Sequence, residues 1–235
     1  MKSPHKLLYA MGVSVLLTTT TILASQVTAQ DIAKKAYDYL DTKDKYAFDA
    51  VIVNHLDKSQ NTHLVSVKVD RPHQVRIDIK GDLKDRSNYI NNGTYTIIDH
   101  DYNYYGELKT PKTINGTLDY IFEKFDIKAP LAQLIYNDMG KRVKFRKSNY
   151  FGVVDVLGVS CDYIAFSDKY KEVHIWVATG EKPLVRHYII INKNNIDNSK
   201  KVTTIHWKDP KNISSSDFVF TAPKNASKIS IEPIQ

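Results

Sequence analysis

The sequence predicts a mainly β (α+β) fold, in which inserted helices plug the concave face of a curved antiparallel sheet or incomplete β-barrel. About ten short segments alternate apolar with polar residues between turn-forming residues, which is the pattern of antiparallel strands. Midway along the chain the apolar spacing changes to that of two amphipathic helices. Because such helices must bury their apolar stripes, we expect them to lie across the concave face of the sheet and to leave an apolar interior.

The first 29 residues have the composition of a secretory signal peptide. Two lysines precede the uncharged segment Leu7–Ala24, and the small residues of a cleavage site end at Ala29. No cysteine stands at the end of the apolar segment, so no lipid anchor is expected there. We therefore expect residues 1–29 to be removed on export, and residues 30–235 to form one soluble exported domain.

A retained transmembrane anchor is the alternative for this N-terminal segment. Leu7–Ala24 lies at the lower limit of the length that spans a bilayer, about 17 to 25 residues. The run of threonines at Thr18–Thr21 weakens the case for a stable span, so cleavage is the favoured interpretation.

Charge and cysteine content exclude several classes of protein. The formal net charge is +7, with both signs spread along the chain. The densest basic cluster, Lys141–Lys147, alternates like a strand with one solvated face, and contact with anionic lipid head groups is the alternative. No nucleic-acid module accompanies it, so no nucleic-acid partner is expected. Cys161 is the single cysteine, so no internal disulfide can form, and we expect a buried, inert thiol rather than a nucleophile.

The first half of the chain is predicted to form a short helix and then strands. Asp31–Leu40 carries its apolar residues at helical spacing. Asn91–Gly93 has the residues of a tight hairpin turn, because asparagine and glycine tolerate positive φ. Alternation with a period of two predicts strands over Phe48–Val53, Leu64–Val69, Gln74–Ile79, Thr94–Ile98 and Tyr102–Leu108.

Two helices are predicted between the strands. The first covers Thr117–Phe125, with Thr117 as its N-cap. The second begins at Pro130 and ends at Gly140, with Met139 on its inward face. Further strands are predicted at Arg142–Phe145, Val153–Leu157, Cys161–Phe166, Val173–Val177, Leu184–Ile191, Val202–Trp207 and Phe218–Phe220.

Few residues suggest chemistry. Asp99, His100 and Asp101 are adjacent, and hydrophilic turn residues explain them better than a metal site. His174 and His187 lie on neighbouring predicted strands, and a turn centred near Glu181 places them on opposite faces of the sheet, although a slip of one residue reverses this. No phosphate loop, nucleophile elbow or zinc motif occurs. We predict no catalytic residue, no metal site and no cofactor.

Several segments spread over the chain together carry a family resemblance. They include Val75–Asp78, Tyr95–Asp99, Thr117–Ile121, Ile127–Tyr136, Gly158–Phe166, Ile175–Val177, Lys182–Arg186 and Asp217–Ala226. In these segments the chain resembles an exported bacterial family of "predicted periplasmic proteins", within the lipoprotein-carrier (LolA/LolB-like) superfamily. This resemblance implies an incomplete β-barrel capped by helices around an apolar cavity, which in the superfamily holds acyl chains of lipoproteins or other lipids. The family has no established activity, so it implies no catalytic residues.

These observations favour a non-catalytic periplasmic carrier for a hydrophobic ligand, a lipid or an acyl chain. The first alternative is an envelope module that binds a protein partner through the open edge of its sheet. The second is a hydrolase with an unrecognised site around Asp99 and His100. Ordinary core packing is the competing explanation for each predicted lining residue. The residues predicted to line the cavity are Leu118, Ile121, Phe122, Phe125, Leu131, Leu134 and Ile135.

Overall fold

A computed structural model describes residues 27–142, 147–193 and 199–234 of the chain. In this part of the chain twelve strands form one open sheet, in the order β12-β6-β5-β4-β3-β2-β1-β11-β10-β9-β8-β7. Neighbouring strands are antiparallel except for β12 and β6, which are parallel. The strands are β1 (Lys45–His55), β2 (Gln60–Asp70), β3 (Gln74–Gly81), β4 (Lys84–Asn91), β5 (Thr94–Asp99), β6 (Tyr104–Lys109), β7 (Lys147–Val156), β8 (Val159–Ser167), β9 (Lys171–Ala178), β10 (Val185–Asn192), β11 (Lys200–Lys208) and β12 (Ser227–Lys228).

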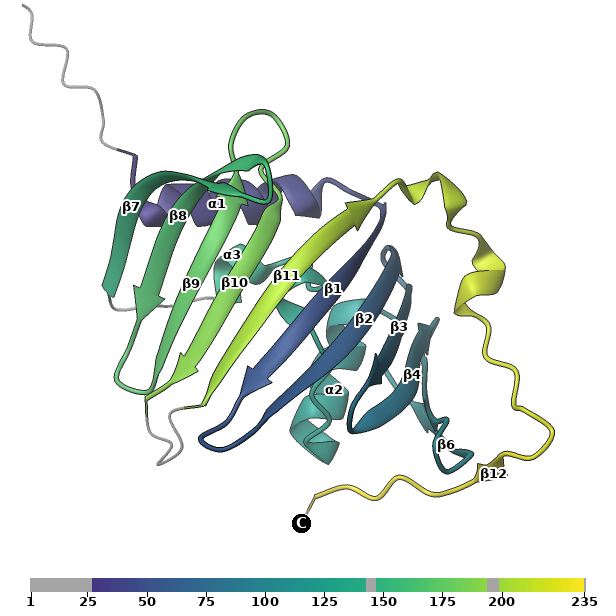
Figure 1. The fold of residues 1–235 in the computed structure, drawn as a ribbon. Coiled ribbons are helices and arrows are strands. Elements are labelled where there is room, and N and C mark those ends of the chain that lie inside the picture. Colours follow the sequence, from purple (N-terminus) through teal and green to yellow (C-terminus); the bar gives the residue numbers. More distant parts are fainter. Residues whose placement is uncertain (1–26, 143–146, 194–198, 235) are drawn as a thin grey trace, which may run out of the picture.

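The α-helices lie on one side of this curved sheet (Figure 1). α1 (Ala29–Asp41) lies behind β7–β10, whereas α2 (Ile114–Phe125) lies behind β1–β3, with the short α3 (Met139–Arg142) between them. This arrangement confirms the predicted fold class: a mainly β chain whose concave face is covered by helices. In the described residues no helix has the length and apolar character needed to cross a membrane.

The main core lies between the concave face of the sheet and the helices. Strand residues at alternate positions, such as Phe48, Val67 and Ile77, are almost completely buried. The helices contribute Leu40 and Ile121 to the same cluster. Burial of each large apolar side chain contributes about 1.5 to 3 kcal/mol, so the many buried residues of this face stabilise the fold.

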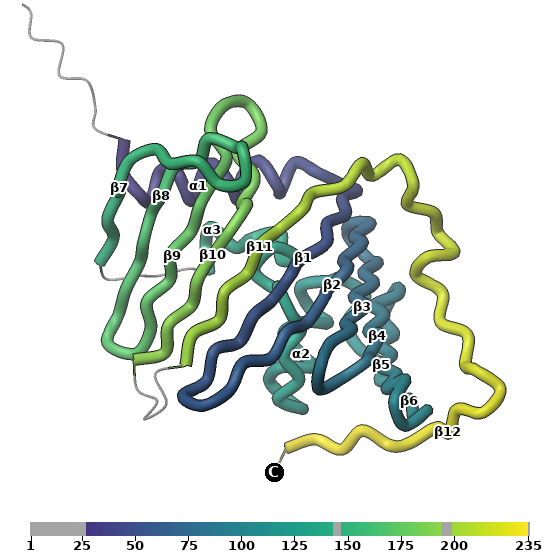
Figure 2. Tube along the Cα trace, in the orientation of Figure 1, coloured from purple at the N-terminus to yellow at the C-terminus, as the bar shows by residue number. Residues whose placement is uncertain are grey.

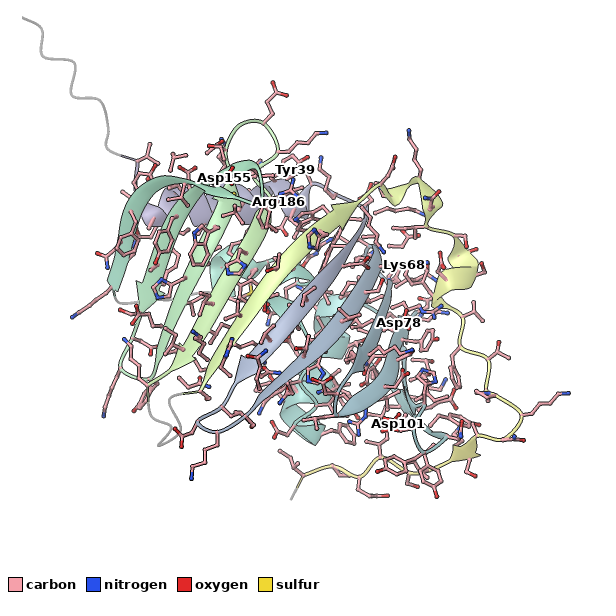
Figure 3. All side chains as sticks on the ribbon, viewed as in Figure 1. Tyr39, Lys68, Asp78, Asp101, Asp155 and Arg186 are labelled. Carbon is pink, nitrogen blue, oxygen red and sulfur yellow. The ribbon has the colours of Figure 1, made fainter. Side chains whose placement is uncertain are left out.

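The convex face is more polar, and the C-terminal segment crosses part of it. Lys68 projects from this face toward that segment (Figure 3), and its Nζ lies 2.5 Å from Oδ1 of Asp217. Phe218 packs with Ala47 and Ile213 in a second, small apolar cluster. Phe218 ends a 3₁₀ turn, Ser215–Phe218, so the predicted strand at Phe218–Phe220 is wrong.

The hairpin turn predicted at Asn91–Gly93 is confirmed. Asn92 and Gly93 have φ values of 50° and 90°, and they join β4 to β5. The strand before this turn, β4, was missing from the sequence prediction. Its residues are mostly polar, and Ser87 and Asn88 are buried within it, so the apolar alternation that marks the other strands is absent.

The second predicted helix, from Pro130 to Gly140, is wrong. Leu131 has a left-handed φ of 60°, and only a 3₁₀ turn, Ala132–Leu134, follows it. Gly140 lies inside α3 rather than at a helix end. Leu131, Leu134 and Ile135 are nevertheless buried, which explains why their spacing resembles one helical stripe.

The predicted N-cap of α2 is also wrong. Thr113 caps this helix, because its side chain accepts a hydrogen bond from the N–H of Gly116. Thr117 lies within the first turns and is fully buried, where its hydroxyl donates to the carbonyl of Pro111 at 2.8 Å. Both threonines precede an apolar stripe, so the sequence pattern alone did not distinguish them.

The strand predicted at Arg142–Phe145 does not begin there, because Arg142 belongs to α3. Residues 143–146 lie outside the described part of the chain, and β7 begins at Lys147. The basic residues of Lys141–Lys147 therefore do not form the single strand that their alternation predicts.

The predicted register of β9 and β10 is wrong by one residue. His187 lies opposite Trp176, and Ile189 lies opposite His174, because the pairing shifts at an irregularity between Val185 and His187. The two histidines consequently share the outer face of the sheet, on either side of Trp176. No group of three metal-ligating side chains occurs in the described residues.

Candidate ligand-binding cavity

A cavity of about 630 Å³ lies between α1 and the concave face of β8–β10. Its walls are mainly apolar, with polar side chains at the rim. The lining residues are Gln30, Asp31, Ala33, Lys34, Tyr37, Gln133, Leu134, Met139, Gly140, Phe166, Lys171, Val173, Ile175, Val185, Tyr188 and Ile190.

Two walls of the cavity come from apolar side chains that recur at regular spacing, one on α1 and one on the strands. Ala33 and Tyr37 are four residues apart on the buried face of α1, so they lie one above the other. On β9, Val173 and Ile175 are two residues apart and therefore point to the same face of the sheet. Ile175 lies opposite Tyr188 on β10, which continues this wall across the strands.

The cavity floor comes from the irregular segment between α2 and α3, residues 126–138, which we call the floor segment. Gln133 donates a hydrogen bond from Nε2 to the hydroxyl of Tyr188. The buried Tyr46 hydroxyl donates to the carbonyl of Leu134 at 2.8 Å, and Arg71 donates from Nη2 to the same hydroxyl at 3.0 Å. These bonds attach the floor segment to the sheet.

The tyrosines of the cavity stay neutral under physiological conditions. Burial raises the pKa of Tyr37 to about 12, and burial also raises the pKa of Tyr188. At the rim, hydrogen bonds from Thr28 lower the pKa of Asp31, so that carboxylate is charged. Neutral walls and a charged rim favour a ligand whose larger part is apolar.

The seven residues predicted to line the cavity do not gather around it. Leu134 is the one among them that lines the 630 Å³ cavity. Phe122 is 50% exposed, and Phe125 is half-buried. The others are buried in the core, namely Leu118, Ile121, Leu131 and Ile135.

Sequence reasoning missed the residues contributed by α1, β9 and β10. The sequence predicts the apolar face of α1, but its strongest helical stripes, at Thr117–Phe125 and after Pro130, point to the middle of the chain for the cavity lining. One sequence feature indicates part of this lining: Ala33 and Tyr37 belong to the apolar stripe of α1. In the structure both residues line the cavity together with Ile175.

The region around Asp99 and His100 is a polar network on the convex side. Ser87 donates from Oγ to Oδ1 of Asp78 at 2.6 Å, and Nε2 of His100 lies 2.9 Å from the same Oγ. Because a serine hydroxyl has one proton, the His100 nitrogen must donate to Ser87. A histidine that activates a serine nucleophile accepts that proton instead, so this order of bonds does not match a serine hydrolase.

Comparison with protein families identifies where the chain belongs. Residues 29–232 match the family described as "Predicted periplasmic protein (DUF2092)". The chain belongs to this family. The match includes every described strand and helix, and it confirms the family resemblance stated from the sequence. No curated protein matches the chain.

Solved structures are similar to the chain at low sequence identity. An uncharacterized conserved protein from Thermus thermophilus is 10% identical, with a TM-score of 0.53 over 86% of this chain and 98% of that one. This likeness concerns the fold alone. A LolA superfamily protein from Nitrosomonas europaea is 11% identical, with a TM-score of 0.41 over 83% of this chain and 98% of that one. The Pseudomonas aeruginosa MucA/MucB complex contains a chain that is 13% identical, with a TM-score of 0.48 over 83% of this chain and 61% of that one.

Proposed function

We propose that the protein is an exported, non-catalytic carrier that holds a hydrophobic ligand, a lipid or an acyl chain, in the cavity beneath α1. The observation that carries this proposal is the 630 Å³ apolar cavity with a polar rim. Ligand sites in proteins have volumes of about 300 to 1,000 Å³, with apolar walls and a few polar groups that orient the ligand.

The expected affinity follows from the burial of methylene groups. Each buried CH₂ contributes about 0.8 kcal/mol, so about ten of them contribute roughly 8 kcal/mol before the costs of association. A single chain of that size corresponds to micromolar binding at most. Such a ligand exchanges readily, as a carrier requires.

The family description and the N-terminal segment support a periplasmic location. Residues 1–29 have the order of basic, apolar and small residues that export machinery recognises. A lipid that crosses the periplasm must be shielded from water, and the apolar cavity provides such shielding.

Titration with a fluorescent fatty-acid analogue tests the proposal. Val173→Trp places an indole in the cavity and is expected to weaken binding at least tenfold, because it fills the space that the chain would occupy. Leu64→Trp is the matched control, since Leu64 lies on the convex face with 57% of its surface exposed. Circular dichroism melts check that both variants fold. Wild-type affinity in Val173→Trp, or no saturable binding to the wild type, contradicts the proposal.

One observation favours a second candidate, a protein-interaction module. β7 forms one edge of the sheet, where Phe151 and Val153 are 54% and 55% exposed. An unpaired edge strand with apolar side chains can pair with an extended segment of another protein. Loss of a cross-linked envelope partner in Val153→Lys, with retention in Leu64→Lys, would support this function over the carrier.

A further inference from the structure

Four basic side chains converge at one end of the concave face. Two of them are the first residues of strands: Lys84 begins β4 and Lys171 begins β9. The other two lie near the beginning of a strand, Lys201 in β11 and His63 in β2. Figure 2 shows that the turns joining β1 to β2, β3 to β4 and β8 to β9 all lie at this end of the sheet. The four residues therefore form a basic group at one rim, which we call the basic rim.

The basic rim is continuous with the cavity. Lys171 itself lines the cavity, together with Val173, two residues further along β9. Lys201 lies opposite Ile190, which is also a lining residue and which itself lies opposite Val173. Lys201 therefore lies on the strand next to the apolar wall of the cavity, directly beside a lining residue.

The lysines of the basic rim have no acidic partner among the described residues. Within residues 27–142, 147–193 and 199–234, no carboxylate forms an ion pair with Lys84, Lys171 or Lys201, whereas other lysines such as Lys45 and Lys68 do have such partners. Lys201 remains open to solvent, yet partial desolvation, followed by the charges of Lys84 and Lys171, lowers the pKa of its ammonium. The mutual repulsion of the three lysines favours an anion between them.

Two acidic groups of the described residues lie near the basic rim without forming an ion pair with its lysines. Asp168 lies close enough to Lys171 to feel its charge, but its Oδ1 accepts the backbone N–H groups of Tyr170 and Lys171, both at 2.7 Å. Asp82 lies near His63 and accepts the backbone N–H of Thr62 at 2.7 Å. Both carboxylates have backbone partners of their own.

His63 is the buried member of the basic rim and adds no charge to it. The residue is 6% exposed, and its Nδ1 has no hydrogen-bond partner in the described structure. Its ring packs against Gly81, where any Cβ would come within 2.2 Å of Nδ1. Burial lowers the pKa of His63, so the ring is neutral at pH 7 and the positive charge belongs to the lysines.

We propose that the basic rim binds the head group of the ligand, and that the ligand is an anionic amphiphile whose carboxylate or phosphate lies among Lys171, Lys201 and Lys84 while its chain occupies the cavity. This inference rests on the proposed carrier function. The apolar part supplies burial, and the charged part fixes the direction in which the chain enters.

The test compares a long-chain fatty acid with the primary alcohol of the same chain length. At low ionic strength the wild type is expected to bind the acid about tenfold more tightly than the alcohol, because the lysines attract the carboxylate alone. Lys171→Met/Lys201→Met is expected to reduce this preference to about twofold, because the double variant loses the attraction for the carboxylate. Lys80→Met/Lys200→Met is the control, since both lysines are on the convex face; it should retain the tenfold preference.

Three outcomes separate the inferences. Equal wild-type affinity for acid and alcohol overturns the head-group subsite and leaves the carrier function intact. Failure of both amphiphiles to bind contradicts the carrier function itself. Inorganic phosphate alone is the third probe, and binding of phosphate as tight as that of the fatty acid would overturn the amphiphile in favour of a free-anion site.

Discussion

Arg71 and Tyr46 show how single side chains fix the cavity floor. Arg71 donates from Nη2 to the carbonyl of Tyr136 at 3.2 Å as well as to the Tyr46 hydroxyl. The Arg71 side chain is 7% exposed, and a carboxylate oxygen of Asp41 lies 3.9 Å from Nη2. The segment below the cavity is therefore attached to β1 through buried polar groups, which a helix with internally satisfied carbonyls would not require.

Removal of the Tyr46 hydroxyl is expected to destabilise the protein. Tyr46→Phe leaves the buried carbonyl of Leu134 without its 2.8 Å donor and removes an acceptor of Arg71. The expected loss in free energy of unfolding is about 1 to 3 kcal/mol, the cost of an unsatisfied buried group. Chemical denaturation measures it, with Tyr39→Phe on α1 as the control. Equal stability of the two variants would show that the floor does not depend on this bond.

His63 and His187 are expected to make stability depend on pH. Burial lowers the pKa of both below the ordinary value, so the unfolded chain binds more protons than the folded one. The free energy of unfolding is then fully retained above the unfolded-state pKa of about 6.5 and falls as the pH drops below it. His63→Leu should flatten this decline in thermal melts between about pH 7.5 and 5.5. A wild-type slope in His63→Leu would contradict the assignment.

At the scale of elements, the sequence pattern predicts the helix α1 correctly but does not predict the backbone of the floor segment. Ile32, Ala36 and Leu40 recur at helical spacing and are all buried in the main core. Leu131 and Leu134 also recur at helical spacing, but the backbone there turns left-handed and its carbonyls bind side chains of the sheet. These contacts join residues that are far apart in sequence, so a local sequence pattern cannot predict them.

The N-cap of α1 lies next to the predicted signal-peptide cleavage site. Thr28 caps the helix: its Oγ1 accepts the N–H of Asp31 at 3.2 Å, and Oδ2 of Asp31 accepts the N–H of Thr28 at 3.1 Å. The predicted cleavage after Ala29 removes this cap and a buried alanine.

A chain that begins at Gln30 is therefore expected to be less stable than one that begins at Val27. Loss of an N-cap costs about 0.5 to 2 kcal/mol, and α1 forms one wall of the cavity. Urea denaturation of the two chains measures the difference, and N-terminal sequencing of the exported protein shows which chain exists, with Gln30 expected. Equal stability would mean that the cap does not stabilise α1.

At the scale of the whole molecule, the strand pattern predicted the sheet, but not where its cavity lies. Val173, Tyr188 and Ala33 come from β9, β10 and α1, and their meeting depends on strand register and on the placement of α1. The irregularity in β10 moved that register by one residue, which no turn signal at Glu181 reveals. The apolar interior was therefore predictable as a property of the fold, whereas its lining was not.

The carrier function depends on whether the cavity beneath α1 holds a ligand in the cell. Native mass spectrometry of the protein, purified from the exported fraction without detergent, tests this most directly. The account predicts a discrete mass adduct that organic extraction identifies as an anionic lipid or fatty acid, and that is absent from Val173→Trp. Protein at its bare mass, which also takes up no amphiphile when one is added, would contradict the account.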